Sequence, residues 1–399
     1  MFQFLKNYRP TIILAILFLT GVIFILTFFP QGFVPLDQRG IFWRFAYEPT
    51  LNLEGRTLEY PVGAWLYFKS VTFPADLLQN FFETPWGAYH FCFSLRIAIF
   101  YLATWILTLA GLKFTTVKKQ ILLGTIFILL FIFANPFLVL STFDMVPTCI
   151  AFLSLFLFQK NKYLASAILL AIATTIKWFP AVLLPIFLIY LLQNKKQLFS
   201  YFFSYTATIV FIILIGSFSV PFAIQQDGLS YHTNRGIHNE SLYGNVFDII
   251  ATKDIHYSTI FNYGSFNIEG TWTNIILPLI FPILILGLLF VYYKSYKNKK
   301  NIAYYSLIAI LIFILLNKVL SPQFIFWLIP FIIYNIFNNN NTDQKLNKRQ
   351  IISLGVFAII LLLGPTVPFY MQESLIHFGW EAISFLTLRN ILLIFLLFL

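Results

Sequence analysis

Residues 31–61 read QGFVPLDQRGIFWRFAYEPTLNLEGRTLEYP and follow a clean apolar run at residues 11–30. Continued to residue 90, this polar stretch holds six of the fifteen acidic residues of the chain: Asp37, Glu48, Glu54, Glu59, Asp76 and Glu83. Charged side chains are costly inside hydrocarbon. The stretch is therefore expected to lie in water, or in a cavity, on one side of a membrane that the apolar run crosses.

The composition of the whole chain is that of a polytopic membrane protein. Its 399 residues are 59% hydrophobic and only 10% charged, and its mean hydropathy is +0.81. A soluble globular protein is nearer to about 25% charged. We predict an all-α transmembrane bundle forming one domain over residues 1–399, with about twelve apolar spans of bilayer length. These are residues 11–30, 91–111, 121–135, 145–158, 163–177, 180–193, 199–220, 273–292, 302–316, 324–337, 350–367 and 381–398.

The basic residues indicate the orientation of this bundle. Most of them gather in one set of short loops and near the N-terminus: Lys6, Arg9, Lys113, Lys118, Lys119, Lys160, Lys162, Lys195, Lys196, Lys294, Lys297, Lys299, Lys300, Lys345, Lys348 and Arg349. Short cytoplasmic loops are rich in Lys and Arg. We therefore expect a multi-pass plasma-membrane protein with both termini cytoplasmic and with residues 31–90 and 221–272 outside.

The net charge of +11 follows from this topology and attracts anionic lipid heads, so no nucleic-acid partner is expected. The only cysteines, Cys92 and Cys149, lie in apolar segments, which argues against a disulfide framework or a thiolate metal site.

Asp37 is the first acid after the first span and should sit close to the membrane surface. A carboxylate beside a low-dielectric wall can serve as a general base when its pKa suits the pH. The alternative is an ordinary solvated loop acid, or an ion-pair partner of Arg39 or Arg44. Glu48, Glu54 and Glu59 are weaker candidates for the base.

A second polar cluster is YHTNRGIHNESLYG at residues 231–244. The planar guanidinium of Arg235 suits phosphate oxygens, and His232 and His238 can donate to phosphate or titrate near neutral pH. The spacing of the two histidines and Glu240 matches no metal-ligand signature. The alternative is a hydrogen-bonded loop that lies over the helices.

Lys177 and Lys318 are isolated charges between apolar runs, in ATTIKWFPAVLLP and LLNKVLSPQFIFWLIP. A lysine at such a corner suggests a functional site with an anionic partner. Snorkelling of the side chain to the outer interface is the alternative. Asp144 is a candidate salt-bridge partner for one of them, in a structural role.

In this order the motifs resemble the GT-C class of integral-membrane glycosyltransferases, and most closely the polyprenyl-phosphate-mannose-dependent alpha-mannosyltransferases, which include the mycobacterial phosphatidylinositol mannoside mannosyltransferase family. The resemblance rests on VPLDQRG, LEGRTLEYPVG, the block at residues 143–185 with its Lys-x-x-Pro, RGIHNESLYG and KVLSPQFIFWLIP. Tyr60-Pro61-Val62 departs from the Tyr-Pro-Pro usual in the family. No Asp-x-Asp pair occurs near Asp37, which argues against an obligatory metal.

The resemblance implies an inverting transfer of a sugar, with mannose favoured, from a polyprenyl-phosphate donor to a lipid-linked or cell-envelope glycan acceptor outside the cell, with no cofactor. Asp37 would take the acceptor proton. Binding of the donor phosphate would fall to Lys177, His232, Arg235 and Lys318. The polar residues of the same motifs that we expect to contact substrate are Tyr60, His238, Asn239, Glu240 and Gln323.

A transporter or flippase of a lipid-linked sugar is the alternative function. Such a protein needs polar residues near the bilayer midplane on broken helices, whereas here they gather at the outer ends and in the outer loops. Arg96 and Arg389 are the exceptions, and the sequence leaves open whether each is a midplane charge or an interfacial one. A third possibility, a structural subunit of a cell-envelope complex, would leave Asp37 and Arg235 dispensable.

Overall fold

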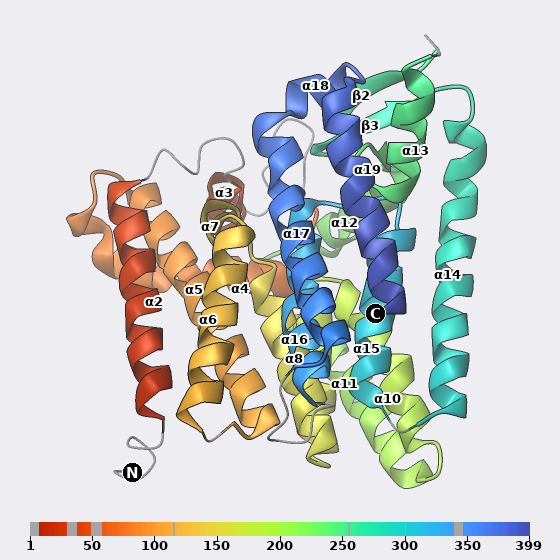
Figure 1. Cartoon of the computed structure of the whole chain (residues 1–399). Coiled ribbons are helices and arrows are strands. Elements are labelled where there is room, and N and C mark those ends of the chain that lie inside the picture. The colour runs from red at the N-terminus through yellow and green to blue at the C-terminus, as the bar shows by residue number, and fades with distance from the viewer. Residues whose placement is uncertain are drawn as a thin grey trace.

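The computed structural model shows helices that run roughly side by side, with a layer of shorter elements across one end (Figure 1). It describes residues 8–29, 38–48, 58–114, 116–253, 256–299, 301–338 and 346–399. The layer contains residues 237–253, 256–269 and 372–376, and we call the end that carries it the loop end. The helix α2 begins at the opposite end.

Six helices in the described parts of the chain are long and apolar enough to cross a bilayer. They are α2 (Arg9–Phe28), α5 (Pro85–Leu112), α11 (Lys195–Ser217), α14 (Thr273–Lys297), α17 (Lys348–Tyr370) and α19 (Trp380–Phe395), the last extended by η5 (Leu396–Phe398). The shorter apolar elements are α6 (Val117–Phe133), α8 (Met145–Gln159), α9 (Tyr163–Ile176), η3 (Phe179–Leu183) with α10 (Leu184–Leu191), α15 (Ile302–Leu316), and η4 (Pro322–Leu328) with α16 (Ile329–Asn338).

Each expected span coincides with one helix or with two helices joined end to end, which confirms the predicted all-α transmembrane bundle. Several of the short helices lie inside the molecule. In α16 the residues from Ile329 to Phe337 are all buried, and a helix that is apolar all round belongs in an interior. The helical turns η3 and η4 each carry a proline in the first turn, Pro180 and Pro322, which breaks the chain into short segments.

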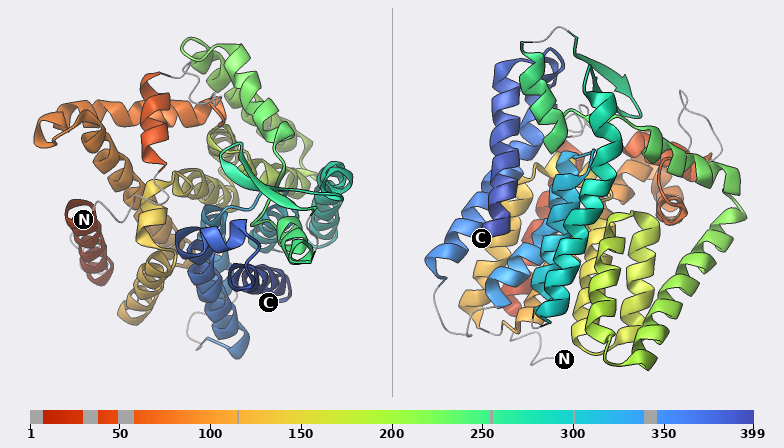
Figure 2. Two further views of the ribbon diagram at one scale, coloured as in Figure 1. Left: turned by 90° about the horizontal axis from the view of Figure 1, so that it is seen from above. Right: turned by 90° about the vertical axis from the view of Figure 1, so that its right-hand side faces the viewer.

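The loop end holds elements that the hydropathy pattern did not predict. These are α3 (Arg39–Tyr47), α4 (Val62–Leu78), η2 (Gln79–Phe81), α7 (Pro136–Ser141), α12 (Phe222–Asn234), α13 (Leu242–Ala251) and α18 (Gln372–Ile376). Seen along the bundle, α12, α13 and α18 lie over the ends of the longer helices (Figure 2).

A small antiparallel sheet is an addition to the predicted all-helical fold. Its strands β1 (Ile237–His238), β2 (Ser258–Asn262) and β3 (Ser265–Glu269) lie in the order β1-β3-β2, with Ile237 opposite Ile268. Tyr263 and Gly264 have positive φ values of 48° and 65° and form the turn between β2 and β3. Two residues with positive φ match the twist of a tight hairpin. The sheet fixes the segment that carries Arg235.

Candidate active site

Lys177 lies directly after α9, in extended backbone, and its ammonium group is held by Asp144. Nζ lies 2.6 Å from Oδ1 of Asp144, and the indole Nε1 of Trp327 donates to the same oxygen at 2.7 Å. The rings of Phe143, Phe324 and Trp327 surround Nζ at 4.8, 5.2 and 5.4 Å from their centroids. The predicted partner role of Asp144 is confirmed. The Asp144 side chain is 1% exposed and that of Lys177 is 13% exposed, so only the cation retains access to the outside.

Lys318 and Arg235 form a second group, in which two cationic residues contact each other. Nζ of Lys318 donates to the carbonyl oxygens of Thr233 and Arg235 at 3.0 and 2.5 Å. Nε of Arg235 donates to Oγ of Ser265 on β3 at 3.1 Å. Burial, and then the charge of Arg235, lower the pKa of Lys318 to about 8. An anion bound beside these cations would favour the charged form of Lys318.

His232 connects the two groups. Its Nε2 lies 2.9 Å from the backbone oxygen of Glu59, in the segment that precedes α4. Burial is the main cause that lowers its pKa, and the charges of Arg235 and Lys177 add to it. His232 thus contacts the Glu59–Tyr60 segment, which packs against Phe143 beside Lys177. Through these contacts and that of Lys318 with Arg235, four basic side chains from segments far apart in the sequence border one region: Lys177, His232, Arg235 and Lys318.

Tyr60 stands next to Glu59 and joins this segment to the Lys177 group. Its ring centroid lies 4.9 Å from that of Phe143, the ring over which Lys177 also lies. Burial, and then the charge of Glu59, hold the pKa of the Tyr60 phenol well above its usual value. Tyr60 is thus a neutral hydrogen-bonding group at the edge of the cationic cluster.

Two close backbone approaches hold the segment at residues 58–63 in place. A Cβ atom added to Gly63, in the first turn of α4, would lie 2.4 Å from the backbone oxygen of Thr175, two residues before Lys177. A Cβ on Gly228 of α12 would lie 2.9 Å from the backbone oxygen of Leu58. At both positions only glycine, which has no Cβ, leaves room for the neighbouring backbone.

We expect Gly63→Ala to destabilise the protein by about 1–3 kcal/mol, because the new methyl group forces α4 away from Thr175. Turnover should fall further than the stability loss explains, since Tyr60 moves with α4. Thermal unfolding and an activity assay in detergent measure both quantities. Gly355→Ala is the matched control, because a Cβ there meets no atom within 4 Å; equal behaviour of the two variants would contradict the prediction.

His238, Asn239 and Glu240 are engaged inside the protein and hold the Arg235 segment. Nδ1 of His238 lies 2.7 Å from the Leu320 backbone oxygen, and burial lowers the His238 pKa to about 3. The Asn239 side chain is buried, and its backbone N–H donates to the Phe266 oxygen at 3.1 Å.

The buried carboxylate of Glu240 accepts from Nη1 of Arg389 on α19 at 2.8 Å, and Nη2 of Arg389 donates to the Glu240 backbone oxygen. Desolvation in this buried site raises the pKa of Glu240. This pair could not be predicted from a local motif, because 149 residues separate its two partners.

Gln323 and Asp37 are the remaining predicted site residues. Gln323 lies half-buried in η4. Asp37 lies outside the described residues, which begin again at Gln38. There the buried Arg39 donates to Oγ of Ser94 at 2.9 Å. Trp327 and Phe324, which frame the Lys177 ammonium, lie in the quoted motif KVLSPQFIFWLIP but were not singled out.

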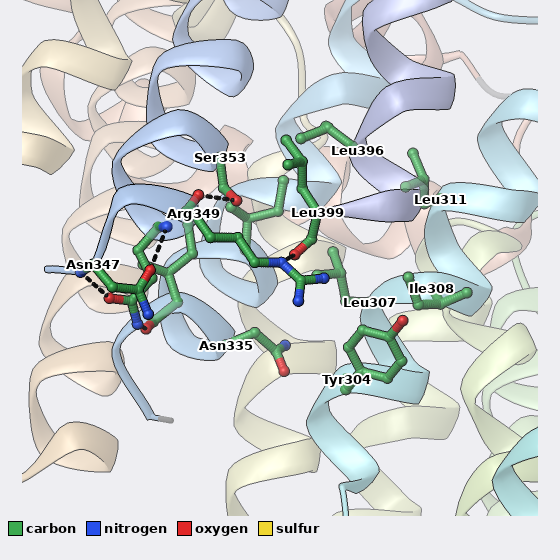
Figure 3. A pocket seen from close by; sticks show the side chains of 13 residues that line it. Tyr304, Leu307, Ile308, Leu311, Asn335, Asn347, Arg349, Ser353, Leu396 and Leu399 are labelled. Carbon is green, nitrogen blue, oxygen red and sulfur yellow. Dashed lines mark hydrogen bonds between the residues drawn. The ribbon is translucent and has the colours of Figure 1, made fainter. Parts of the chain in front are cut away.

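A cavity of about 420 Å³ lies elsewhere, where α17 begins, between α15, α16, α17 and η5 (Figure 3). There Nε and Nη2 of Arg349 donate to the backbone oxygens of Leu399 and Phe398 at 2.5 and 3.2 Å. None of the predicted site residues lines this cavity. The candidate active site is therefore defined by the contacts of the cationic cluster.

Comparison with known proteins identifies the family. The sequence profile of glycosyltransferase family 87 matches residues 60–322, about two thirds of the chain, and the chain belongs to this family. The match includes Lys177, Arg235 and Lys318 and begins beyond Asp37. It confirms the expected class of membrane glycosyltransferase.

Two crystal structures of ArnT from Cupriavidus metallidurans, one bound to undecaprenyl phosphate and one in the apo state, are similar to this structure. Both share 12% identity with it over 96% of this chain and 76% of theirs, with TM-scores of 0.44 and 0.43. No curated protein matches the sequence.

Proposed function

We propose that this member of glycosyltransferase family 87 transfers a sugar from a polyprenyl-phosphate donor to a hydroxyl group of a lipid-linked or cell-envelope glycan acceptor. The convergence of Lys177, His232, Arg235 and Lys318 at one site carries the proposal. A phosphate group is the ligand that such a cluster suits. The apolar exterior of the bundle accommodates the isoprenoid tail of the same molecule in the bilayer.

The proposed reaction is a single displacement at the anomeric carbon. The acceptor oxygen forms a bond to this carbon while the bond to the phosphate oxygen breaks, which inverts the configuration. The bonding electron pair leaves on the polyprenyl phosphate, and the acceptor proton passes to Asp37. Lys177, Arg235 and Lys318 stabilise the negative charge that grows on the leaving phosphate, which is where cations contribute most to rate.

Mannose is the favoured sugar, because the mannosyltransferases resemble this chain in their motifs. The test is to incubate the purified protein with a panel of labelled polyprenyl-phosphate sugars and membrane lipids and to identify labelled lipid products. Transfer from one member of the panel, and its loss in Arg235→Gln, are expected. No labelled product from any donor would overturn the proposal.

We further propose that the loop end faces the outside of the plasma membrane, because the loops rich in Lys and Arg lie at the other end. A cysteine replacing the exposed Ser258 on β2 should react with a membrane-impermeant thiol reagent added to intact cells. A cysteine replacing the exposed Gln193, between α10 and α11, should react only after lysis. The reverse pattern would overturn this orientation. The native Cys92 and Cys149 are buried and leave the background low.

A further inference from the structure

One carboxylate oxygen of Glu59, Oε2, is buried without a partner among the described residues, although the Glu59 side chain also reaches the phenol of Tyr60. Within the described residues, Oε2 of Glu59 is shielded from solvent and has no hydrogen-bond partner. Leaving an acceptor unpaired in a buried place costs stability, so native proteins pair such atoms with protein, water or ligand. Asp144 shows the contrast, because its carboxylate accepts from both Lys177 and Trp327.

The position of Glu59 places this oxygen at the candidate active site. Its own backbone oxygen contacts the ring of His232, and its charge acts on both His232 and Tyr60. Through these neighbours it borders the cationic cluster. The carboxylate does not form an ion pair with Lys177, whose ammonium is held by Asp144.

The backbone around Glu59 is held rigidly. The ring of Tyr60 packs against Phe42, Phe68 and Phe143, with centroids 6.0, 6.1 and 4.9 Å away. On the other side, Gly228 approaches the backbone oxygen of Leu58. A group fixed in this way is pre-organised for a ligand and loses little entropy when the ligand binds.

We infer that Oε2 of Glu59 accepts a hydrogen bond from a hydroxyl group of the transferred sugar, an inference that rests on the proposed function. An ionised carboxylate only accepts hydrogen bonds, and a sugar hydroxyl donates them. A phosphate is anionic and is repelled, so Glu59 marks the sugar side of the site and the cations mark the phosphate side. The same charge disfavours sugars with a carboxylate group, and the substrate class is a sugar without negative charge.

The test compares Glu59→Gln with wild-type protein and with Glu83→Gln, an exposed acid of the same outer segment. For Glu59→Gln we expect kcat/KM for the donor to fall about 10- to 100-fold, the value of a hydrogen bond to a charged group. Binding of sugar-free polyprenyl phosphate should be unchanged or tighter, because the variant removes a negative charge near the phosphate. Glu83→Gln should match the wild type in both measurements.

Donors whose sugar lacks one hydroxyl group sharpen the test. With wild-type protein, one deoxy donor should lose activity by a similar factor. Glu59→Gln keeps only a neutral amide oxygen, which is a weaker acceptor than a carboxylate. This variant should therefore discriminate less between the deoxy donor and the full sugar. Should Glu59→Gln fold poorly, Glu59→Asp is the second variant. It keeps the carboxylate on a side chain that is shorter by one methylene group. It should then discriminate less between the deoxy and the full sugar.

Three outcomes distinguish failure of the inference about Glu59 from failure of the proposed function. Wild-type kcat/KM in Glu59→Gln would overturn the inference and leave the proposed function standing. If Glu59→Gln lost binding of sugar-free polyprenyl phosphate by the same factor as kcat/KM, the inference would also be overturned, because such a loss indicates a structural role. Failure of the wild-type protein to use any polyprenyl-phosphate sugar would overturn the proposed function and, with it, the inference.

Discussion

Asp37→Asn is expected to lower turnover by about 10²–10⁴-fold while the protein folds and binds polyprenyl phosphate normally. Asparagine is nearly the same size as aspartate but cannot accept the acceptor proton. Asp37 is the first acid beyond the first span in the sequence, and we propose it as the base on that ground. Single-turnover transfer from a labelled donor, normalised to folded protein, measures the effect.

Glu48→Gln is the matched control for this variant. Glu48 is an exposed acid at the end of α3, in the same polar stretch, and its loss should leave turnover near the wild-type value. Turnover near normal in Asp37→Asn would show that Asp37 is a loop acid or an ion-pair partner. If Glu48→Gln were inactive instead, the base would move to Glu48.

The transmembrane frame could be predicted from the sequence because hydropathy acts locally. An apolar segment of bilayer length has few alternatives to a helix, since lipid satisfies no backbone hydrogen bond. The lone charges were informative for the same reason. Lys177 and Asp144 had to be compensated within an apolar interior, and the structure pairs them directly.

The helices and strands of the loop end were not predicted, because contacts between residues far apart in the sequence stabilise them. The helix α4 carries Pro74 and follows a polar stretch, so it was expected as part of a loop. The hairpin of β2 and β3 had a local signal, the turn at Tyr263-Gly264, within a segment assigned only as an outer loop. Arg389 is expected from the sequence as a charge at the midplane or at the interface, but its partner Glu240 could not be inferred.

Lys177→Met is expected to reduce both stability and turnover, for two separable reasons. It leaves the Asp144 carboxylate, 1% exposed, without its cation. Removal of one partner of a buried ion pair costs about 3–5 kcal/mol. It also removes a cation that we place against the leaving phosphate, and the loss of such a group lowers the rate by about 10²–10³-fold. A single variant therefore cannot distinguish a structural lysine from a catalytic one.

The double variant Asp144→Asn with Lys177→Met separates the two roles. It removes the uncompensated charge, and the asparagine oxygen still accepts from Nε1 of Trp327, as Asp144 does at 2.7 Å. Most of the lost stability should return. Turnover should stay as low as in Lys177→Met, because the Lys177 cation is still missing from the phosphate site. The measurements are thermal unfolding and donor kcat/KM for all four members of the cycle.

Asp144→Asn alone completes the cycle, because it keeps the lysine and removes its acid. The ammonium remains among the rings of Phe143, Phe324 and Trp327 and stays available to a phosphate. Its turnover should therefore exceed that of the double variant by at least about tenfold, since the phosphate-binding cation is still present. If the double variant recovered the turnover of Asp144→Asn, Lys177 would act only as the counter-ion of Asp144, and phosphate binding would rest on Arg235 and Lys318.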